Sequence, residues 1–200
     1  MIQERIRAHY RHHLKAEGRL TTKRSMYVAD YNKQTGSKEG VKLFDCPPPT
    51  EEIKCFILNN PRGIEITGLP FDKMSFVKPE GGSESQCECV IYPEENDETS
   101  WICFIELKYT EHKHFKRANE ARKQLHKTQA YYRSKGIFGE KNTCYLLASL
   151  PQQKDPIIRG MKNFLRENIP SSLDEKSESN AVVIRVCNSA EILNHNKLLV

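Results

Sequence analysis

Two stretches, Gln86–Tyr92 (QCECVIY) and Trp101–Tyr109 (WICFIELKY), decide the fold of this 200-residue chain. Both are short runs with the aromatic and β-branched residues that are typical of β-strands. The segment between them, residues 93–100 (PEENDETS), is acidic and turn-forming, so we expect the two runs to pair as an antiparallel hairpin. The second run is apolar on both faces until Glu106, which indicates a central strand that is buried on both sides.

Hydrophobic periodicity and turn residues predict the other elements. Helices are expected at residues 2–17, 50–59, 113–134, 155–168 and 189–199. Strands are expected at residues 63–69, 142–150 and 181–187, and irregular structure at residues 18–48 and 170–180. This order predicts a mixed α/β fold, in which an antiparallel meander leads through a helical crossover to a further strand. We expect one domain at residues 49–200, preceded by an N-terminal helical and irregular extension at residues 1–48.

The composition indicates a globular chain. Its 38% hydrophobic residues suffice for a core, and they are not depleted to the level that marks disordered chains. The chain has no run of about 18 apolar residues and no apolar core at its N-terminus, so neither a transmembrane helix nor a secretory signal is expected. The seven cysteines are scattered, which predicts free thiols in a reducing compartment and a cytoplasmic location.

The net charge of +5 conceals a strong segregation of charge along the chain. Residues 79–107 hold eight acidic residues and no basic ones, whereas residues 108–135 hold nine basic residues and two acidic ones. Basic blocks favour a polyanionic partner, although a solvated helix face would explain them equally well. A divalent metal site that serves a phosphate substrate would explain an acidic cluster beside a basic helix.

The sign of the charge changes between Glu106 and Lys108, at the end of the apolar strand. The two-residue period of a strand places both side chains on one face. Burying these two charges costs free energy unless they form an ion pair or take part in the function of a site. The hairpin can bring Glu88, the only acid in its apolar run, opposite this pair. Carboxylates, a divalent metal and a lysine suit phosphodiester hydrolysis. The alternative is a buried ion pair with a purely structural role.

These features resemble the PD-(D/E)XK nuclease superfamily over about residues 50–150. The matching pattern is a helix, three strands, a basic helix and a strand, with CECVIY as the second strand and WICFIELKYT as the third. The resemblance implies a restriction-endonuclease-like core, in which helices flank a central mixed sheet. It also implies that Glu88, Glu106 and the Leu107 carbonyl bind Mg²⁺ or Mn²⁺, and that Lys108 is catalytic. By the same resemblance, Glu51 or Glu52 would join the outer shell of the metal.

The chain departs from the family pattern in two places. The first metal-binding acid is usually Asp, so Asp72, which lies 34 residues before Glu106, is an alternative to Glu88. The RecB-type subfamilies carry Gln-x-x-x-Tyr on the following helix, and no Gln of this helix is followed by Tyr at that spacing. We therefore expect Gln124 to be a solvated helix residue, with a position facing the site as the alternative.

The resemblance further implies a metal-dependent nuclease that acts on DNA, in an endonuclease role. A small nuclease without a sequence-reading module needs control. By analogy, we expect a regulatory or ATPase partner within a prokaryotic restriction or antiviral defence complex, in contact with residues 1–48. The number of copies in the assembly is left open. The alternative function is a catalytically silent nuclease-fold subunit that binds nucleic acid or bridges proteins. The basic residues expected to contact DNA are Lys113, Lys116, Arg117, Lys123 and Lys127.

Two other groups of metal-ligand residue types are weaker candidates. The pair Cys87-x-Cys89 lies inside an apolar strand, and structural zinc sites prefer wider spacings in turns. His112 and His114 are expected on the surface, with phosphate contact or proton transfer as the alternative. His9, His12 and His13 are also expected on the surface, with an interface or nucleic-acid contact as the alternative.

Overall fold

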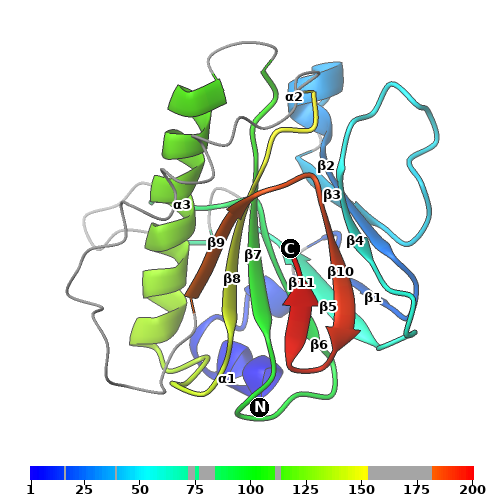
Figure 1. Ribbon diagram of the computed structural model, residues 1–200. Coiled ribbons are helices and arrows are strands. Elements are labelled where there is room, and N and C mark those ends of the chain that lie inside the picture. Colours follow the sequence, from blue (N-terminus) through cyan, green and yellow to red (C-terminus); the bar gives the residue numbers. More distant parts are fainter. Residues whose placement is uncertain (16, 39, 72–74, 77–83, 111–113, 153–181) are drawn as a thin grey trace.

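The computed structural model describes residues 1–15, 17–38, 40–71, 75–76, 84–110, 114–152 and 182–200. These residues form two mixed β-sheets and a few helices, so the expected mixed α/β class is confirmed (Figure 1). None of the described helices is both long enough and apolar enough to cross a membrane.

The first sheet contains the predicted hairpin at its centre. Its strands, in spatial order, are β1 (Leu20–Thr22), β5 (Ile66–Pro70), β6 (Cys89–Pro93), β7 (Ile102–Leu107), β8 (Cys144–Ser149) and β9 (Val182–Val186). The pairs from β1 to β7 are antiparallel, whereas β8 runs parallel to both β7 and β9. In the hairpin Val90 lies opposite Phe104, and every residue of β7 is buried, as a central strand requires.

The second sheet is built from segments that are far apart in the sequence. Its order is β11 (Lys197–Leu199), β10 (Ser189–Asn194), β4 (Phe56–Asn59), β2 (Met26–Asp30) and β3 (Val41–Phe44). Only β4 and β10 are parallel, and the other pairs are antiparallel. The helices are α1 (Ile2–His9), a 3₁₀ turn at His13–Lys15, α2 (Tyr31–Thr35) and α3 (His114–Ser134).

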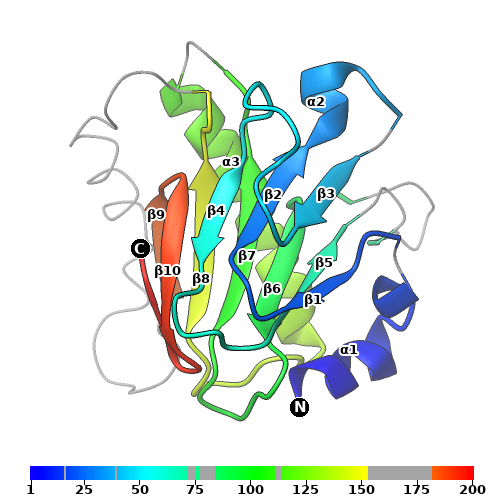
Figure 2. The same ribbon diagram turned by 90° about the vertical axis from the view of Figure 1, so that its right-hand side faces the viewer.

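The first sheet is the middle layer of the molecule. The helices α1 and α3 pack on one of its faces, and the second sheet packs on the other (Figures 1 and 2). Successive residues of β7 therefore alternate between two cores, with Phe104 on the helix side and Ile105 on the side of the second sheet. The sheets approach closely at Gly68, where an added Cβ would lie 2.7 Å from the side chains of both Met26 and Leu43.

Several predicted elements are confirmed. The long basic helix and the strands expected at residues 63–69, 142–150 and 181–187 are present, with ends shifted by a few residues. The helix expected at residues 2–17 ends earlier, at His9, because Tyr10 leaves the helical conformation. The helix expected at 155–168 and the loop expected at 170–180 lie outside the described residues.

Three other predictions are wrong, and each of them missed strands of the second sheet. Residues 18–48 are not irregular, because they supply β1, β2, α2 and β3. The helix expected at 50–59 is replaced by β4, and the helix expected at 189–199 is the hairpin of β10 and β11. Consequently the central sheet is not flanked by helices on both faces, since the second sheet covers one of them.

Candidate active site

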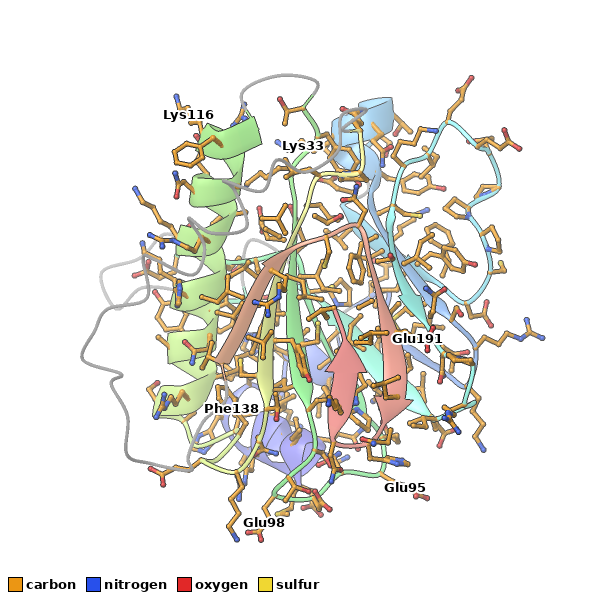
Figure 3. All side chains as sticks on the ribbon, viewed as in Figure 1. Lys33, Glu95, Glu98, Lys116, Phe138 and Glu191 are labelled. Atoms are coloured by element: carbon orange, nitrogen blue, oxygen red, sulfur yellow. The ribbon has the colours of Figure 1, made fainter. Side chains whose placement is uncertain are left out.

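The candidate site lies at the carboxyl end of the central strand β7, where several other elements also end. The parallel strands β7 and β8 are joined through α3, so their carboxyl ends meet at the same edge as the start of that helix. The end of β2 and the short helix α2 lie at this same end of the molecule (Figure 1). Lys33 of α2 and Lys116 of α3 mark this end in Figure 3, and Glu98 marks the opposite end.

Glu106 and Lys108 form the predicted pair. Glu106 has no exposed surface, and the Nζ atom of Lys108 lies 2.5 Å from its Oε1 atom. Burial raises the pKa of Glu106 to about 7, against the lowering effect of the Lys108 ammonium. The Oε2 atom of Glu106 is buried and has no hydrogen-bond partner among the described residues. A buried carboxylate oxygen without a partner is costly, so this atom is the least satisfied polar group of the site.

Gln124 faces the site, so the prediction that it is solvated is wrong. It lies on α3 and accepts a hydrogen bond of 2.5 Å from Lys108 Nζ through Oε1. Its Nε2 donates to the carbonyl of Gln86 at 2.9 Å, which fixes the orientation of the amide. One turn later, Thr128 Oγ1 accepts from the backbone N–H of Cys87 at 2.8 Å. The helix is thereby joined to the chain that leads into β6.

Glu88 lies at a bend immediately before β6. Its N–H donates to Ile105 of β7 at 2.9 Å, whereas its carbonyl accepts from Phe71 at 2.8 Å, so one residue bonds to neighbours on both sides. Cys87 packs in the helix-side core and Cys89 in the core below the second sheet, although residues two apart in a regular strand share a face. The bend at Glu88 therefore separates the faces on which Cys87 and Cys89 pack.

The charge environment of Glu88 joins it to the pair on β7. Burial raises the pKa of Glu88 to about 8, and the carboxylates of Glu106 and Asp30 raise it further. Lys108 and Lys33 act in the opposite direction. Glu88 and Glu106 therefore influence each other's charge, while their joint role as metal ligands stays a prediction.

Asp30 is a site residue that the sequence did not reveal. It is the last residue of β2, it is buried, and its carboxylate caps α2 by accepting from the Lys33 N–H at 3.1 Å. Its own N–H donates to the Tyr109 hydroxyl at 3.0 Å, and that hydroxyl donates to the Lys54 carbonyl at 3.1 Å. The available signal was a single acid at the end of the run MYVAD, inside a segment that was expected to be irregular.

The other predicted metal ligands do not join this group of side chains within the described residues. The Leu107 side chain packs on the opposite face, in the core below the second sheet, and the role of its carbonyl stays a prediction. Glu51 and Glu52 are exposed in the turn before β4, and no hydrogen bond or ion pair within the described residues joins Glu52 to Glu106. Asp72 lies outside the described residues.

Within the described part of the chain, no three His, Cys, Asp or Glu side chains are grouped to hold a metal ion. A metal here would therefore depend on two carboxylates, a carbonyl and water.

The basic residues of α3 divide into two sets. Lys116, Lys123 and Lys127 are exposed and share the face that points away from the sheet, because they are spaced by seven and four residues. Arg117 lies on the flank that carries Gln124 and pairs with Glu120 at 2.8 Å. Lys113 lies outside the described residues.

The remaining candidates are structural. Cys87 and Cys89 are buried, and burial raises the pKa of both thiols well above the usual value, which disfavours metal binding. His13 is buried rather than exposed, since its Nδ1 lies 2.9 Å from the Tyr132 hydroxyl and its Nε2 donates to the Ser75 carbonyl at 2.9 Å. His112 lies outside the described residues.

The arrangement as a whole places the carboxylates of Glu88 and Glu106, both of raised pKa, near the ammonium of Lys108 at the end of β7. One carboxylate oxygen of Glu106 has no hydrogen-bond partner among the described residues. Such a group can hold a hard cation and place an ammonium beside a phosphoryl oxygen. No family model matches the chain, and no curated protein and no solved structure matches it either.

Proposed function

We propose that this chain is a metal-dependent nuclease of the PD-(D/E)XK type, which hydrolyses DNA phosphodiester bonds at Glu88, Glu106 and Lys108. The observation that carries the proposal is the Oε2 atom of Glu106. This atom is buried and has no hydrogen-bond partner among the described residues, and Lys108 follows two residues later at the end of β7. Leaving this oxygen without a partner costs free energy, and a cation would supply the missing interaction.

Glu88, Glu106 and the Leu107 carbonyl would hold Mg²⁺ or Mn²⁺. All three offer oxygen ligands, and Mg²⁺ commonly uses one or two carboxylates and completes its shell with water and substrate phosphate. The small number of acids at this site is therefore compatible with Mg²⁺. When bound, the ion would polarise the phosphoryl group and lower the pKa of a bound water.

Lys108 supplies the positive charge at the reacting group. Its Nζ lies between Glu106 Oε1 and Gln124 Oε1, at 2.5 Å from each, and its side chain is 19% exposed. The ammonium is therefore held in place and still reaches solvent at the edge of the sheet. From there it can donate to a phosphoryl oxygen and stabilise the charge that develops during hydrolysis.

The exposed basic residues of α3 favour DNA as the polyanion. Lys116, Lys123 and Lys127 form one solvent-facing row that can follow a phosphate backbone, so binding should weaken as the salt concentration rises. We further propose that the chain acts within a prokaryotic restriction or antiviral defence complex, in which a regulatory or ATPase partner gates it.

Cleavage of supercoiled, linear duplex and single-stranded DNA by the full chain tests the proposal, with Mg²⁺, Mn²⁺ or EDTA present. We expect cleavage only with a divalent ion, and Lys108→Ala should lower the rate at least about a hundredfold. Lys141→Ala is the matched control, because Lys141 is an exposed lysine paired with Glu98 at the opposite end of the molecule (Figure 3). Unchanged cleavage by Lys108→Ala would refute the site, and DNA binding without cleavage by the wild-type chain would favour the catalytically silent alternative.

A further inference from the structure

A cavity of about 280 Å³ lies between the segment that follows α1 and helix α3, where Tyr131 stands about two helical turns beyond Gln124. Its wall includes Tyr10, Phe76 and Tyr131, together with His12 and Glu84. We propose that it binds an unpaired nucleobase of the nucleic acid, an inference that rests on the proposed function. The volume is equivalent to about nine water molecules, so a flat heterocyclic base fits within it.

The aromatic rings of the cavity provide stacking surfaces that are held in place. Phe76 and Tyr131 stack with their centroids 5.0 Å apart and their planes at 22°, and Tyr10 meets Phe76 edge-on at 5.3 Å. Tyr10 also stacks on the buried Tyr132 at 5.6 Å, so the wall is continuous with the helix-side core. Aromatic walls of this kind bind bases by stacking and tolerate any base, because every base has a π-face.

Polar groups at the edge of the cavity suit the edge of a base. Burial raises the pKa of Tyr131 and the nearby Glu84 carboxylate raises it further, and this carboxylate offers acceptor positions. His12 uses its Nε2 to donate to the Ser75 carbonyl at 3.0 Å, so its ring is oriented. A carboxylate acceptor favours ligands that present N–H donors, such as the ring and amino N–H groups of bases.

Two structural links join this cavity to the catalytic groups. Tyr131 follows Gln124 by seven residues on the same flank of α3, which corresponds to about 10 Å along the helix. Glu84 precedes Gln86 by two residues, and the Gln86 carbonyl bonds to Gln124. A strand held at Lys108 can therefore deliver a base to the cavity within about three nucleotides. Because a paired base cannot enter, the base must come from a single strand or be flipped out of a duplex.

Binding of an oligonucleotide that carries 2-aminopurine, measured by quenching of its fluorescence in EDTA, tests the inference. We expect wild-type chain to quench the base, Tyr131→Ala to weaken binding at least about fivefold, and Tyr131→Phe to retain it because the ring remains. Tyr27→Ala is the matched control, since Tyr27 is a half-buried tyrosine of the second sheet, which packs on the face of the first sheet opposite to α1 and α3. Unchanged affinity of Tyr131→Ala would overturn the inference.

A second arm separates the possible sources of the base. The mononucleotide of 2-aminopurine, at the same concentration, should bind more weakly than the oligonucleotide, and equal affinity would overturn the assignment to a nucleic-acid strand. Because EDTA prevents metal-dependent cleavage, this assay does not depend on the catalytic groups. Failure of the nuclease proposal would appear in the cleavage assay, whereas failure of the base-binding inference would appear only here.

Discussion

Replacing Glu106 with Gln should stabilise the protein at pH 8 and flatten the pH dependence of its stability. Burial raises the pKa of this carboxyl from 4.5 to about 7, so the folded chain binds its proton more tightly than the unfolded chain. The stability associated with Glu106 is therefore fully present below pH 4.5 and is lost as the pH rises to about 7. At 1.36 kcal/mol per pH unit, the loss amounts to about 3 kcal/mol. Gln has the same shape and does not titrate.

Urea unfolding of wild type and Glu106→Gln between about pH 4.5 and pH 8 measures this loss directly. We expect the free energy of unfolding to fall more steeply with pH in wild type than in the variant. The control is Glu98→Gln, because Glu98 is 62% exposed and pairs with the exposed Lys141, and it should follow wild type. Parallel pH profiles for wild type and Glu106→Gln would refute the placement of an ionisable, buried Glu106.

The urea unfolding experiment can be repeated with Mg²⁺ to test whether Glu106 binds a divalent ion. A cation that binds the ionised Glu106 stabilises the folded state by mass action, so Mg²⁺ should raise the unfolding midpoint of wild type at pH 8. The gain should shrink at pH 5, where protons compete for the carboxylate, and it should disappear in Glu106→Gln. An equal gain in wild type and variant at both pH values would show that Mg²⁺ binds elsewhere.

Two further predictions concern packing and positioning. Gly68→Val should lower the free energy of unfolding by about 1–3 kcal/mol, because the new side chain meets Met26 and Leu43 where the two sheets approach; an unchanged urea midpoint would contradict this close approach. Gln124→Leu should lower the cleavage rate about tenfold to a hundredfold with little change in DNA affinity, because Lys108 loses its second partner. A variant that cleaves at the wild-type rate would show that Gln124 does not position the lysine.

The first sheet was largely predictable because its signals are local and strong. The hairpin of β6 and β7 consists of apolar runs around a turn, and α3 has a long periodic pattern that ends near Gly136. The second sheet was missed because its strands are short and pair across the whole chain, as β4 does with β10. Within residues 189–199, Ala190 and Ile192 alternate with polar residues, and the Asn-rich turn that follows is a hairpin signal that outweighs helix propensity.

The candidate site was predictable to the extent that its charges interrupt apolar sequence. Glu106 and Lys108 stood out for this reason, and their ion pair follows from strand periodicity. Gln124 could not be assigned to the site from sequence, because its position depends on where α3 meets the chain before β6. Asp30 could not be placed either, since only the packing of the second sheet brings the end of β2 near Glu88.

The bend at Glu88 explains why a regular strand from Gln86 onward does not describe this part of the hairpin. In a regular strand, Glu88 would share the face of Val90, in the helix-side core, and Cys87 would share the face of Cys89. The bend instead leaves the Cys87 N–H to bond to Thr128 of α3, while Glu88 lies in reach of the charges of Asp30 and Lys33 as well as Lys108. Glu88 thus lies between the charged end of β7 and the end of β2 in the second sheet. Deleting Glu88 would therefore be expected to remove both a carboxylate and the geometry that directs it, whereas Glu88→Gln would remove the charge alone.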